Sequence, residues 1–299
     1  MTIAARPIHP LFVAELTGAD LSRPLDPATR DEIERAMDRY AVCVLPSQKL
    51  DDDKQTAFAS LYGPLEVSPL THKRDGGPLA PPRIQNRNIF DVSNLDESGN
   101  ILPLDDQRRA YRQGNELWHT DSSFRQKSAT WSMLHARVIP PNGADTEFAD
   151  TRAAYDALPD STKRKIENLV AEHSIWHSRA KLGGYTPTEQ ERKDRPPALH
   201  PLVRRHPGSG RKALYIASHA SHILGMPVDE GRALLAELLE FATQARFVYT
   251  HKWRLGDLVI WDNRCTLHRA TPFESSTQMR DMRRSTIIDV DAYVPAMAS

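Results

Sequence analysis

The chain has 299 residues, of which 39% are hydrophobic and 26% charged, and its 39 Lys and Arg residues balance its 39 Asp and Glu residues. This composition is typical of an ordinary globular protein, and the balanced charge creates no net field that would attract nucleic acid or an anionic membrane. The sequence therefore predicts neither a nucleic-acid-binding protein nor a membrane-surface protein.

Cysteine usage and the N-terminus indicate the compartment. The chain has two cysteines, Cys43 and Cys265, so a disulfide framework is not expected and a reducing compartment fits better. The N-terminus has no basic stretch followed by a long apolar region, and no apolar run approaches the length of a membrane span. We therefore expect a cytoplasmic protein.

The first 63 residues predict alternating strands and helices. Asp26 and Pro27 form a helix start, with Asp as N-cap and Pro at the first helical position, and Gly63 is a plausible helix end. In chain order, we expect a strand at 12–16, a helix at 27–41, a strand at 41–46 and a helix at 53–63.

The pattern changes between residues 64 and 115. Prolines, glycines, asparagines and charges interrupt every apolar run there. Loops of this length inside compact domains are usually functional or disordered. We interpret 64–115 as a long, partly irregular insertion.

The remainder is rich in short strands separated by tight turns, which favours a β-sandwich or barrel with helices packed outside it. No feature divides the chain, so we expect one domain over residues 1–299. The expected strands are 131–139, 146–149, 213–217 and four after residue 245; the expected helices begin near Asp150, at 161–172 and at 228–244, and 177–200 is expected to be loop.

The segment ELWHTDSSF contains a histidine and an aspartate two residues apart, His119 and Asp121. On an extended strand such residues project to the same face and can reach one ion, whereas on a helix they point apart. This spacing also arises by chance, so alone it gives a metal site only about one chance in ten. A metal site needs a third ligand from elsewhere.

His268 is the favoured third ligand among the twelve histidines. It follows the strand-like DLVIWDNRCTL, where an apolar run breaks into polar residues, and Arg280 and Arg284 come soon after it. Two histidines and one carboxylate form the facial triad that leaves open positions on iron(II). Zinc sites of the hydrolytic kind more often have three protein ligands and one water.

Several motifs together resemble one family. WHTD at 118–121, GADT at 143–146, WDN at 261–263, LHR at 267–269 and RDMRRST at 280–286 resemble, in order and spacing, the iron(II)/2-oxoglutarate dioxygenases. The similar branch contains taurine dioxygenase and 2,4-dichlorophenoxyacetate dioxygenase, and EFADTRAAYDALPD and GRKALYIASHA resemble the latter. The resemblance implies an α+β fold with a double-stranded β-helix (jelly-roll) core, flanking helices and a lid-like insertion at about 64–115.

The resemblance also implies roles for particular residues. His119, Asp121 and His268 would hold Fe(II), and Thr146 and Arg280 would bind the distal carboxylate of the cosubstrate 2-oxoglutarate. Arg284 would bind the acidic group of the primary substrate. Strand alternation agrees, since on a strand over 280–288 Arg280 and Arg284 share one face, about 13 Å apart, while Asp281 and Arg283 face the other way.

Three further residues are candidate substrate contacts within the insertion: His72, Lys73 and Asn94. Ordinary loop polarity is at least as good an explanation for each of them.

The implied reaction consumes O2 and 2-oxoglutarate and hydroxylates an aryloxyalkanoate, such as 2,4-dichlorophenoxyacetate, next to its ether oxygen. The products would be a phenol, glyoxylate, succinate and CO2. Alternatives are a taurine-like alkylsulfonate dioxygenase, a zinc-dependent hydrolase with the same three ligands, and a non-catalytic protein that binds small acids. Expected partners are a small aromatic or aryloxy acid and further copies of the chain in a homo-oligomer.

Overall fold

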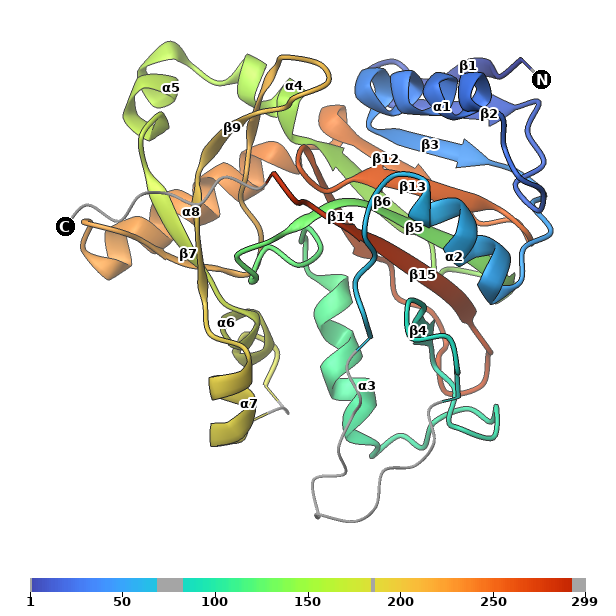
Figure 1. The fold of residues 1–299 in the computed structure, drawn as a ribbon. Helices are drawn as coiled ribbons and strands as arrows, with labels where there is room; N and C mark the ends of the chain where they lie inside the picture. The colour runs from blue at the N-terminus through green and yellow to red at the C-terminus, as the bar shows by residue number, and fades with distance from the viewer. Residues whose placement is uncertain (1, 69–82, 184–185, 292–299) are drawn as a thin grey trace.

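The computed structural model describes residues 2–68, 83–183 and 186–291, whose strands form four sheets with helices on their outer sides (Figure 1). The largest sheet crosses the molecule, and its seven strands come from both ends and the middle of the chain. In sheet order they are β1 (Ala4–His9), β2 (Val13–Thr17), β3 (Val42–Leu45), β13 (Leu258–Asp262), β5 (Ala129–Val138), β15 (Asp281–Ile288) and β4 (Phe90–Ser93).

A second, antiparallel sheet packs against this one. Its strands, in sheet order, are β12 (Val248–His251), β6 (Thr146–Asp150) and β14 (Thr266–Ala270). Phe148 from β6 shares a buried apolar cluster with Val259 and Trp261 from β13 and Leu134 from β5. The core of this part of the molecule therefore lies between the two sheets.

The strands of the large sheet alternate between two apolar faces. On β13, Val259 and Trp261 point into the cluster between the sheets, whereas Leu258 and Ile260 belong to a cluster on the opposite face. This is the two-residue period of a strand that is buried on both sides. We call the face toward the second sheet the inner face and the opposite one the outer face.

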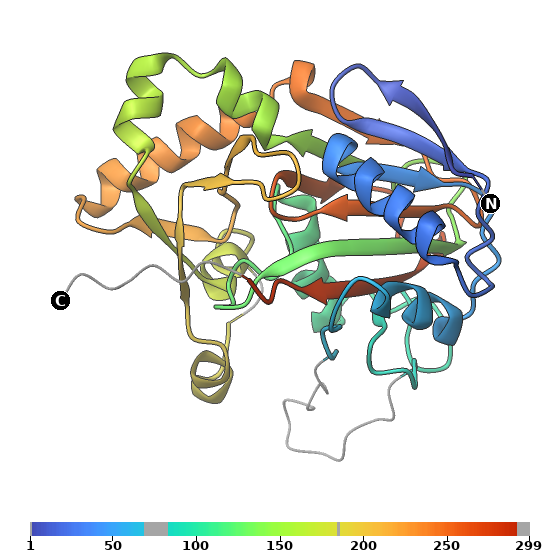
Figure 2. The ribbon, with the colours of Figure 1, turned by 45° about the horizontal axis from the view of Figure 1, so that its top comes forward.

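Helices α1 (Pro27–Tyr40) and α2 (Asp52–Ser60) cover the outer face, as Figure 2 shows for α1. The predicted start of α1 is confirmed, because the carboxylate of Asp26 accepts a hydrogen bond from the Thr29 amide at 2.9 Å. The predicted end of α2 at Gly63 is three residues too late, since the helix ends at Ser60.

A further cluster of buried apolar residues surrounds α8 (Val228–Ala242), the predicted amphipathic helix. The other elements described here are α3 (Gln107–Arg112), η1 (Gln113–Glu116), α4 (Thr151–Ala157), α5 (Asp160–Ile166), β7 (Val170–His173), α6 (Ile175–Ala180), α7 (Glu189–Asp194), β8 (Ala198–Pro201), β9 (Val203–Arg205), β10 (Lys212–Leu214), β11 (Ala220–Ile223) and η2 (Ala245–Phe247).

Two predictions about this region were wrong. The helix expected over 161–172 ends at Ile166, and β7 follows because it pairs with both β8 and β11. The expected loop over 177–200 contains parts of α6 and the whole of α7. Tertiary pairing decides the first case, and six-residue helices are too short to give a clear period in the second. None of the helices in the described parts of the chain is long and apolar enough to cross a membrane.

Candidate active site

A short backbone bridge brings two of the predicted metal ligands together. The amides of His119 and His268 each donate to the other residue's carbonyl, at 3.0 and 2.7 Å. His119 follows η1, and His268 lies in the middle of β14. Their ring centroids are 4.1 Å apart, although 148 residues lie between them in the sequence. Backbone pairing with β14 therefore brings two residues that are distant in the sequence into contact.

Asp121 joins them from a turn. Of the two residues, only His119 makes an extended bridge, and Ser122 has a φ of +56°, so His119 and Asp121 do not share a strand. The turn nevertheless directs the carboxylate toward the histidines, and the Asp121 Oδ2 atom lies 3.8 Å from His268 Nε2. One ligand atom from each of the three residues lies within 4.8 Å of the others.

Asn263, at the end of β13, connects the turn to the sheets. Its Oδ1 atom accepts hydrogen bonds from the Asp121 amide at 3.1 Å and from the Trp261 indole at 3.0 Å. Its Nδ2 atom donates to the Ser132 hydroxyl, which in turn donates to Asp121 Oδ2 at 2.7 Å. These contacts fix the orientation of the Asp121 carboxylate. Sequence reasoning quoted WDN as a motif without assigning this role to the asparagine.

The histidines are held as neutral ligands. The Nδ1 atom of His119 forms a hydrogen bond with the Leu117 carbonyl at 2.7 Å, which leaves Nε2 for the site. Burial lowers the pKa of His119 and lowers that of His268 further. Burial works to raise the pKa of Asp121, but Arg284 and the two histidines outweigh it, so its pKa lies below the ordinary value. Neutral imidazoles and an ionised carboxylate are the forms that bind metal.

These residues fit a divalent metal ion. All three are buried, and two ligand atoms 3.8 Å apart can share one ion when each lies about 2.1 Å from it. A second buried group, made of His206, Asp262 and Cys265, does not fit. There the guanidinium of Arg264 lies 2.6 Å from Asp262 and already neutralises the carboxylate.

Arg280 is a buried cation without an acidic partner. It is 8% exposed, and no carboxylate in residues 2–68, 83–183 or 186–291 forms an ion pair with it. Within the described parts of the chain, its one side-chain hydrogen bond is long, 3.4 Å to the Val92 carbonyl. Burial lowers the pKa of this guanidinium to about 10. Such a group is costly unless an anion binds it.

Thr146 lies at the start of β6, between His251 of β12 and Ala270 of β14. The residue is buried, and its hydroxyl accepts a hydrogen bond from the Trp253 indole at 3.0 Å. The hydroxyl hydrogen remains available to an acceptor such as a carboxylate.

Arg284 points from β15 toward the metal ligands. Its Nη1 atom donates to Asp121 Oδ1, and its guanidinium lies over the ring of Phe90 at 4.9 Å. Asp281 and Arg283 contact one another and residues of α2 and β4 on the outer face. The predicted division of β15 into two faces is therefore confirmed.

Glu66 is a buried acid that sequence reasoning missed. It is 2% exposed, and its Oε1 atom has no hydrogen-bond partner in the described parts of the chain. Burial raises the pKa of Glu66, while Arg125, Ser122 and Arg284 act to lower it. Its amide donates to the Thr286 carbonyl at 2.8 Å, so it lies beside β15. A glutamate in an irregular segment gives no local signal of burial.

Comparison with known proteins decides the family. The family model "Taurine catabolism dioxygenase TauD, TfdA family" matches residues 4–286. The chain belongs to the TauD/TfdA family. It is 47% identical, over 98% of its length and 100% of the relative's, to the alpha-ketoglutarate-dependent 2,4-dichlorophenoxyacetate dioxygenase of Cupriavidus pinatubonensis. It is 38% identical to the (S)-phenoxypropionate/alpha-ketoglutarate-dioxygenase of Sphingobium herbicidovorans, over 98% of this chain and 97% of the relative.

A solved structure of the TauD/TfdA type matches the whole fold. The crystal structure of AAD-2 in complex with Mn(II) and N-oxalylglycine has a TM-score of 0.89 and 47% sequence identity, covering 99% of this chain and 100% of that one.

The three candidate substrate contacts of the insertion have different outcomes. His72 and Lys73 lie outside the described residues. Asn94 is buried, and its Nδ2 atom donates to the carbonyls of Ser275 at 2.9 Å and Gln278 at 2.8 Å. Its Oδ1 atom accepts from the Arg280 amide at 2.8 Å. In this TauD/TfdA chain Asn94 therefore holds the loop that leads into β15, and a substrate contact by Asn94 stays a prediction.

Proposed function

We propose that this protein is an iron(II)- and 2-oxoglutarate-dependent dioxygenase that hydroxylates aryloxyalkanoic acids such as 2,4-dichlorophenoxyacetate. The observation that carries the proposal is the buried meeting point of His119, Asp121 and His268 in a chain 47% identical to a dioxygenase named for that substrate. This function requires Fe(II) as the cofactor, with 2-oxoglutarate and O2 as cosubstrates. The facial arrangement of two histidines and one carboxylate suits iron(II) and leaves positions open for them.

The metal would be held by His119, Asp121 and His268. When bound, it supplies together with 2-oxoglutarate and O2 the oxidising power that inserts oxygen into a C–H bond. The rings of Trp261 and Phe148 pack against His268, with centroids 4.7 and 6.2 Å away, and keep water from that side. Asn263 and Ser132 hold the carboxylate of Asp121 in one orientation.

We propose that Arg280 and Thr146 bind the distal carboxylate of 2-oxoglutarate. A carboxylate would give Arg280 the counter-charge that it lacks, in the bidentate geometry for which a guanidinium is suited. The AAD-2 crystal structure contains N-oxalylglycine, which has an N–H group where 2-oxoglutarate has a methylene group. A site for this kind of dicarboxylate in a neighbour with 47% identity supports the assignment.

We propose that Arg284 orients the primary substrate by its acidic group. The Nη1 atom is engaged with Asp121, whereas Nε is buried without a hydrogen-bond partner in the described parts of the chain. A planar guanidinium has five donors, so it can hold Asp121 and a second carboxylate at once. The acidic group of the substrate would then lie beside the carboxylate of Asp121. This placement would direct the carbon next to the acidic group toward the metal.

The products follow from hydroxylating the carbon between the acid and the ether oxygen. The resulting hemiacetal breaks its C–O bond to the ether oxygen, giving a phenol and glyoxylate. 2-Oxoglutarate leaves as succinate and CO2, with one oxygen atom of O2 in succinate and one in the hydroxylated carbon.

We further propose that the facing sheets form the double-stranded β-helix (jelly-roll) core expected for this family, within a single domain over residues 1–299. The buried cluster shared by the large sheet and the β12-β6-β14 sheet supports this view. The described parts of the lid-like insertion expected at about 64–115, residues 64–68 and 83–115, would cover the substrate side. Phe90, which lies under Arg284, is the described residue that supports this role.

Coupled turnover tests the proposal. The purified protein with Fe(II), 2-oxoglutarate and O2 should form succinate and a phenol in equal amounts from 2,4-dichlorophenoxyacetate, and only background succinate from taurine. If succinate formed with taurine but not with 2,4-dichlorophenoxyacetate, the protein would be an alkylsulfonate dioxygenase instead. Hydrolysis of a substrate with zinc, without O2 or 2-oxoglutarate, would replace the dioxygenase by a hydrolase.

A further inference from the structure

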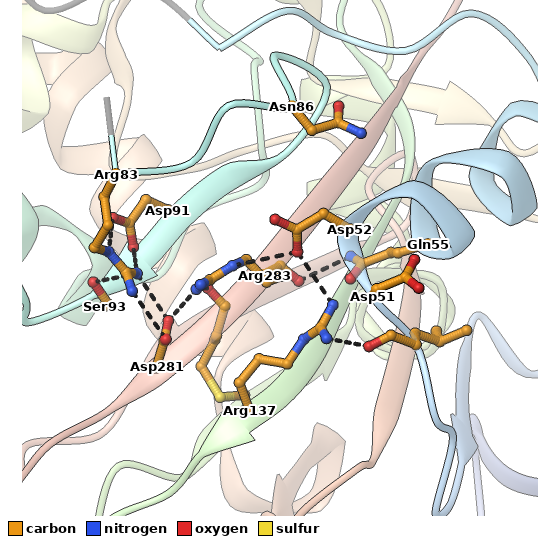
Figure 3. Close-up of polar contacts among 12 residues, drawn as sticks. Asp51, Asp52, Gln55, Arg83, Asn86, Asp91, Ser93, Arg137, Asp281 and Arg283 are labelled. Atoms are coloured by element: carbon orange, nitrogen blue, oxygen red, sulfur yellow. Dashed lines mark hydrogen bonds and ion pairs between the residues drawn. The ribbon is translucent and has the colours of Figure 1, made fainter. Parts of the chain in front are cut away.

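Strand β15 carries charged residues on both faces, and those on its outer face belong to an ionic network (Figure 3). The inner face carries Arg284, and Arg280 immediately precedes the strand. The outer face carries Asp281 and Arg283. The inference below rests on the proposed function, because it concerns how the two inner arginines are placed.

The network alternates in sign across β4, β15, α2, β5 and the segment that precedes β4. Near one end Arg83 links two aspartates, with Nη2 2.6 Å from Asp91 and 2.9 Å from Asp281. Asp281 also pairs with Arg283, whose Nε atom lies 3.5 Å from Asp52. Asp52 in turn lies 3.2 Å from Arg137, as the dashed lines in Figure 3 show.

The network contains three arginines and three aspartates, so its formal charge is zero. Its side chains are between 12% and 31% exposed. Burial works to raise the pKa of Asp281, but Arg83 and Arg283 outweigh it and keep the pKa below its ordinary value. Connected, partly desolvated pairs of this kind contribute more than isolated surface pairs do.

A β-bulge lies at the same place. In the pairing of β15 with β5, Asp281 is opposite Val138 but Met282 is opposite Ala136, so Arg137 is the extra, unpaired residue of β5. The Arg137 side chain is held on the outer face by the Leu50 carbonyl and by Asp52. A bulge bends its strand and re-aims the side chains beside it. The bulge of β5 lies opposite Asp281 and Met282, which stand between Arg280 and Arg284 in the sequence.

Helix α2 contacts the same stretch through a neutral residue. Gln55 is fully buried, and its Nε2 atom donates to the Arg283 carbonyl at 2.9 Å. The outer face of β15 is therefore fixed from α2, β4 and β5 together. The inner face has a different environment, since Arg280 has no ion pair and Arg284 contacts Asp121 and Phe90.

We propose that this outer-face ionic network holds β15 in register at the bulge of β5 and thereby positions Arg280 for 2-oxoglutarate and Arg284 for the substrate acid. Asp281 and Asp52 are then positioning residues. They touch neither substrate nor metal and act through the strand that carries the two arginines. A shift of one residue in β15 pairing would exchange its faces, so the network excludes the register that would bury Asp281 and Arg283 inside.

The metal ligands do not lie on β15, so we expect a change in the network to affect the two arginines more than the metal site. His119 and Asp121 precede β5, and His268 lies on β14. Weakening the network should therefore change the affinity for Fe(II) less than it changes the affinity for 2-oxoglutarate, although Arg284 contacts Asp121. It should weaken binding of 2-oxoglutarate and loosen the placement of the substrate. A loosely placed substrate lets 2-oxoglutarate be consumed without hydroxylation, so the ratio of succinate to phenol should rise above one.

Asp281→Asn is the first variant, because the carboxamide keeps the shape of the side chain and removes its charge. We expect the KM for 2-oxoglutarate to rise roughly five- to twentyfold. We also expect the succinate-to-phenol ratio to rise, with kcat changing less than KM. Asp52→Asn perturbs the same bulge from α2 and should give a smaller change in the same direction. It remains informative if D281N does not fold.

The matched control is Asp156→Asn, which breaks an ion pair outside the network. Asp156 lies 2.6 Å from Arg211, is 55% exposed, and should give the wild-type KM and product ratio when changed. Adding Arg83→Gln to D281N should raise KM less than the sum of the two single effects, because both remove one interaction.

The outcomes separate this inference from the proposed function. A lower melting temperature for D281N and D52N with an unchanged KM and product ratio would show that the network only stabilises the fold, and would overturn the inference alone. A wild-type protein that neither binds 2-oxoglutarate nor converts an aryloxyacetate would overturn the proposed function, and this inference with it.

Discussion

Replacing Arg280 by glutamine should stabilise the ligand-free protein while it weakens binding of 2-oxoglutarate. Burial lowers the pKa of Arg280 from its ordinary value to about 10. A base whose folded-state pKa lies below its unfolded-state pKa destabilises the folded protein at every pH below the folded value. The cost is about 3 kcal/mol at neutral pH, since one pKa unit corresponds to about 1.4 kcal/mol. Glutamine removes the charge that causes this cost.

The gain will be smaller than the full desolvation cost. The variant loses the 3.4 Å hydrogen bond to the Val92 carbonyl and leaves some unfilled space, which together cost about 1 to 2 kcal/mol. We therefore expect R280Q to be more stable by about 1 to 2 kcal/mol. Loss of a bidentate, charge-assisted pair should raise the Kd for 2-oxoglutarate about a hundredfold, which is about 2.8 kcal/mol.

Arg152 provides the matched control. Its side chain is 0% exposed. Unlike Arg280, however, Arg152 has an acidic partner, because its Nε atom lies 3.0 Å from the equally buried carboxylate of Asp150. R152Q should destabilise the protein by about 3 kcal/mol, because it leaves the buried carboxylate of Asp150 with only the guanidinium of Arg211, 3.9 Å away, as a counter-charge. Denaturant unfolding of the ligand-free variants and anaerobic calorimetric titration of 2-oxoglutarate measure both effects. An R280Q protein less stable than the wild type, with an unchanged Kd, would refute the reasoning.

Three further predictions concern residues around the metal ligands. Asp121→Ala should abolish succinate formation while circular dichroism shows a folded protein; unchanged turnover would remove Asp121 from the site. Asn263→Ala frees the Asp121 amide and the Ser132 hydroxyl, and should weaken Fe(II) binding about 10- to 100-fold in a metal titration. Glu66→Gln should raise stability at pH 8, and because burial raises the pKa of Glu66, this advantage should shrink as the pH falls through that pKa; an advantage that does not change with pH would contradict it.

The fold could be predicted where the chemistry is local. The N-cap at Asp26 and the two faces of β15 follow from capping and strand geometry, and each is confirmed. The strand β7 was missed because its neighbours β8 and β11 decide its conformation. Short helices such as α6 leave no pattern that separates them from a loop.

The candidate site divides in the same way. The three metal-ligand candidates were found from residue type and motif order, and the structure brings them within reach of one ion. The turn at Asp121 could not be predicted, because it depends on the hydrogen bond that the Asp121 amide donates to the side-chain oxygen of Asn263, far along the chain. Glu66 and the bulge at Arg137 are likewise products of strand pairing. A sequence pattern therefore predicts metal ligands more readily than it predicts the residues that orient those ligands.

Anaerobic titration of Fe(II) into the protein, in the presence of 2-oxoglutarate, tests most directly whether His119, Asp121 and His268 form one iron site. A weak visible charge-transfer band should grow to a limit at one iron per chain, shift when 2,4-dichlorophenoxyacetate is added, and be lost in His268→Ala. A band of full strength in that variant, or no band in the wild-type protein, would contradict the assignment.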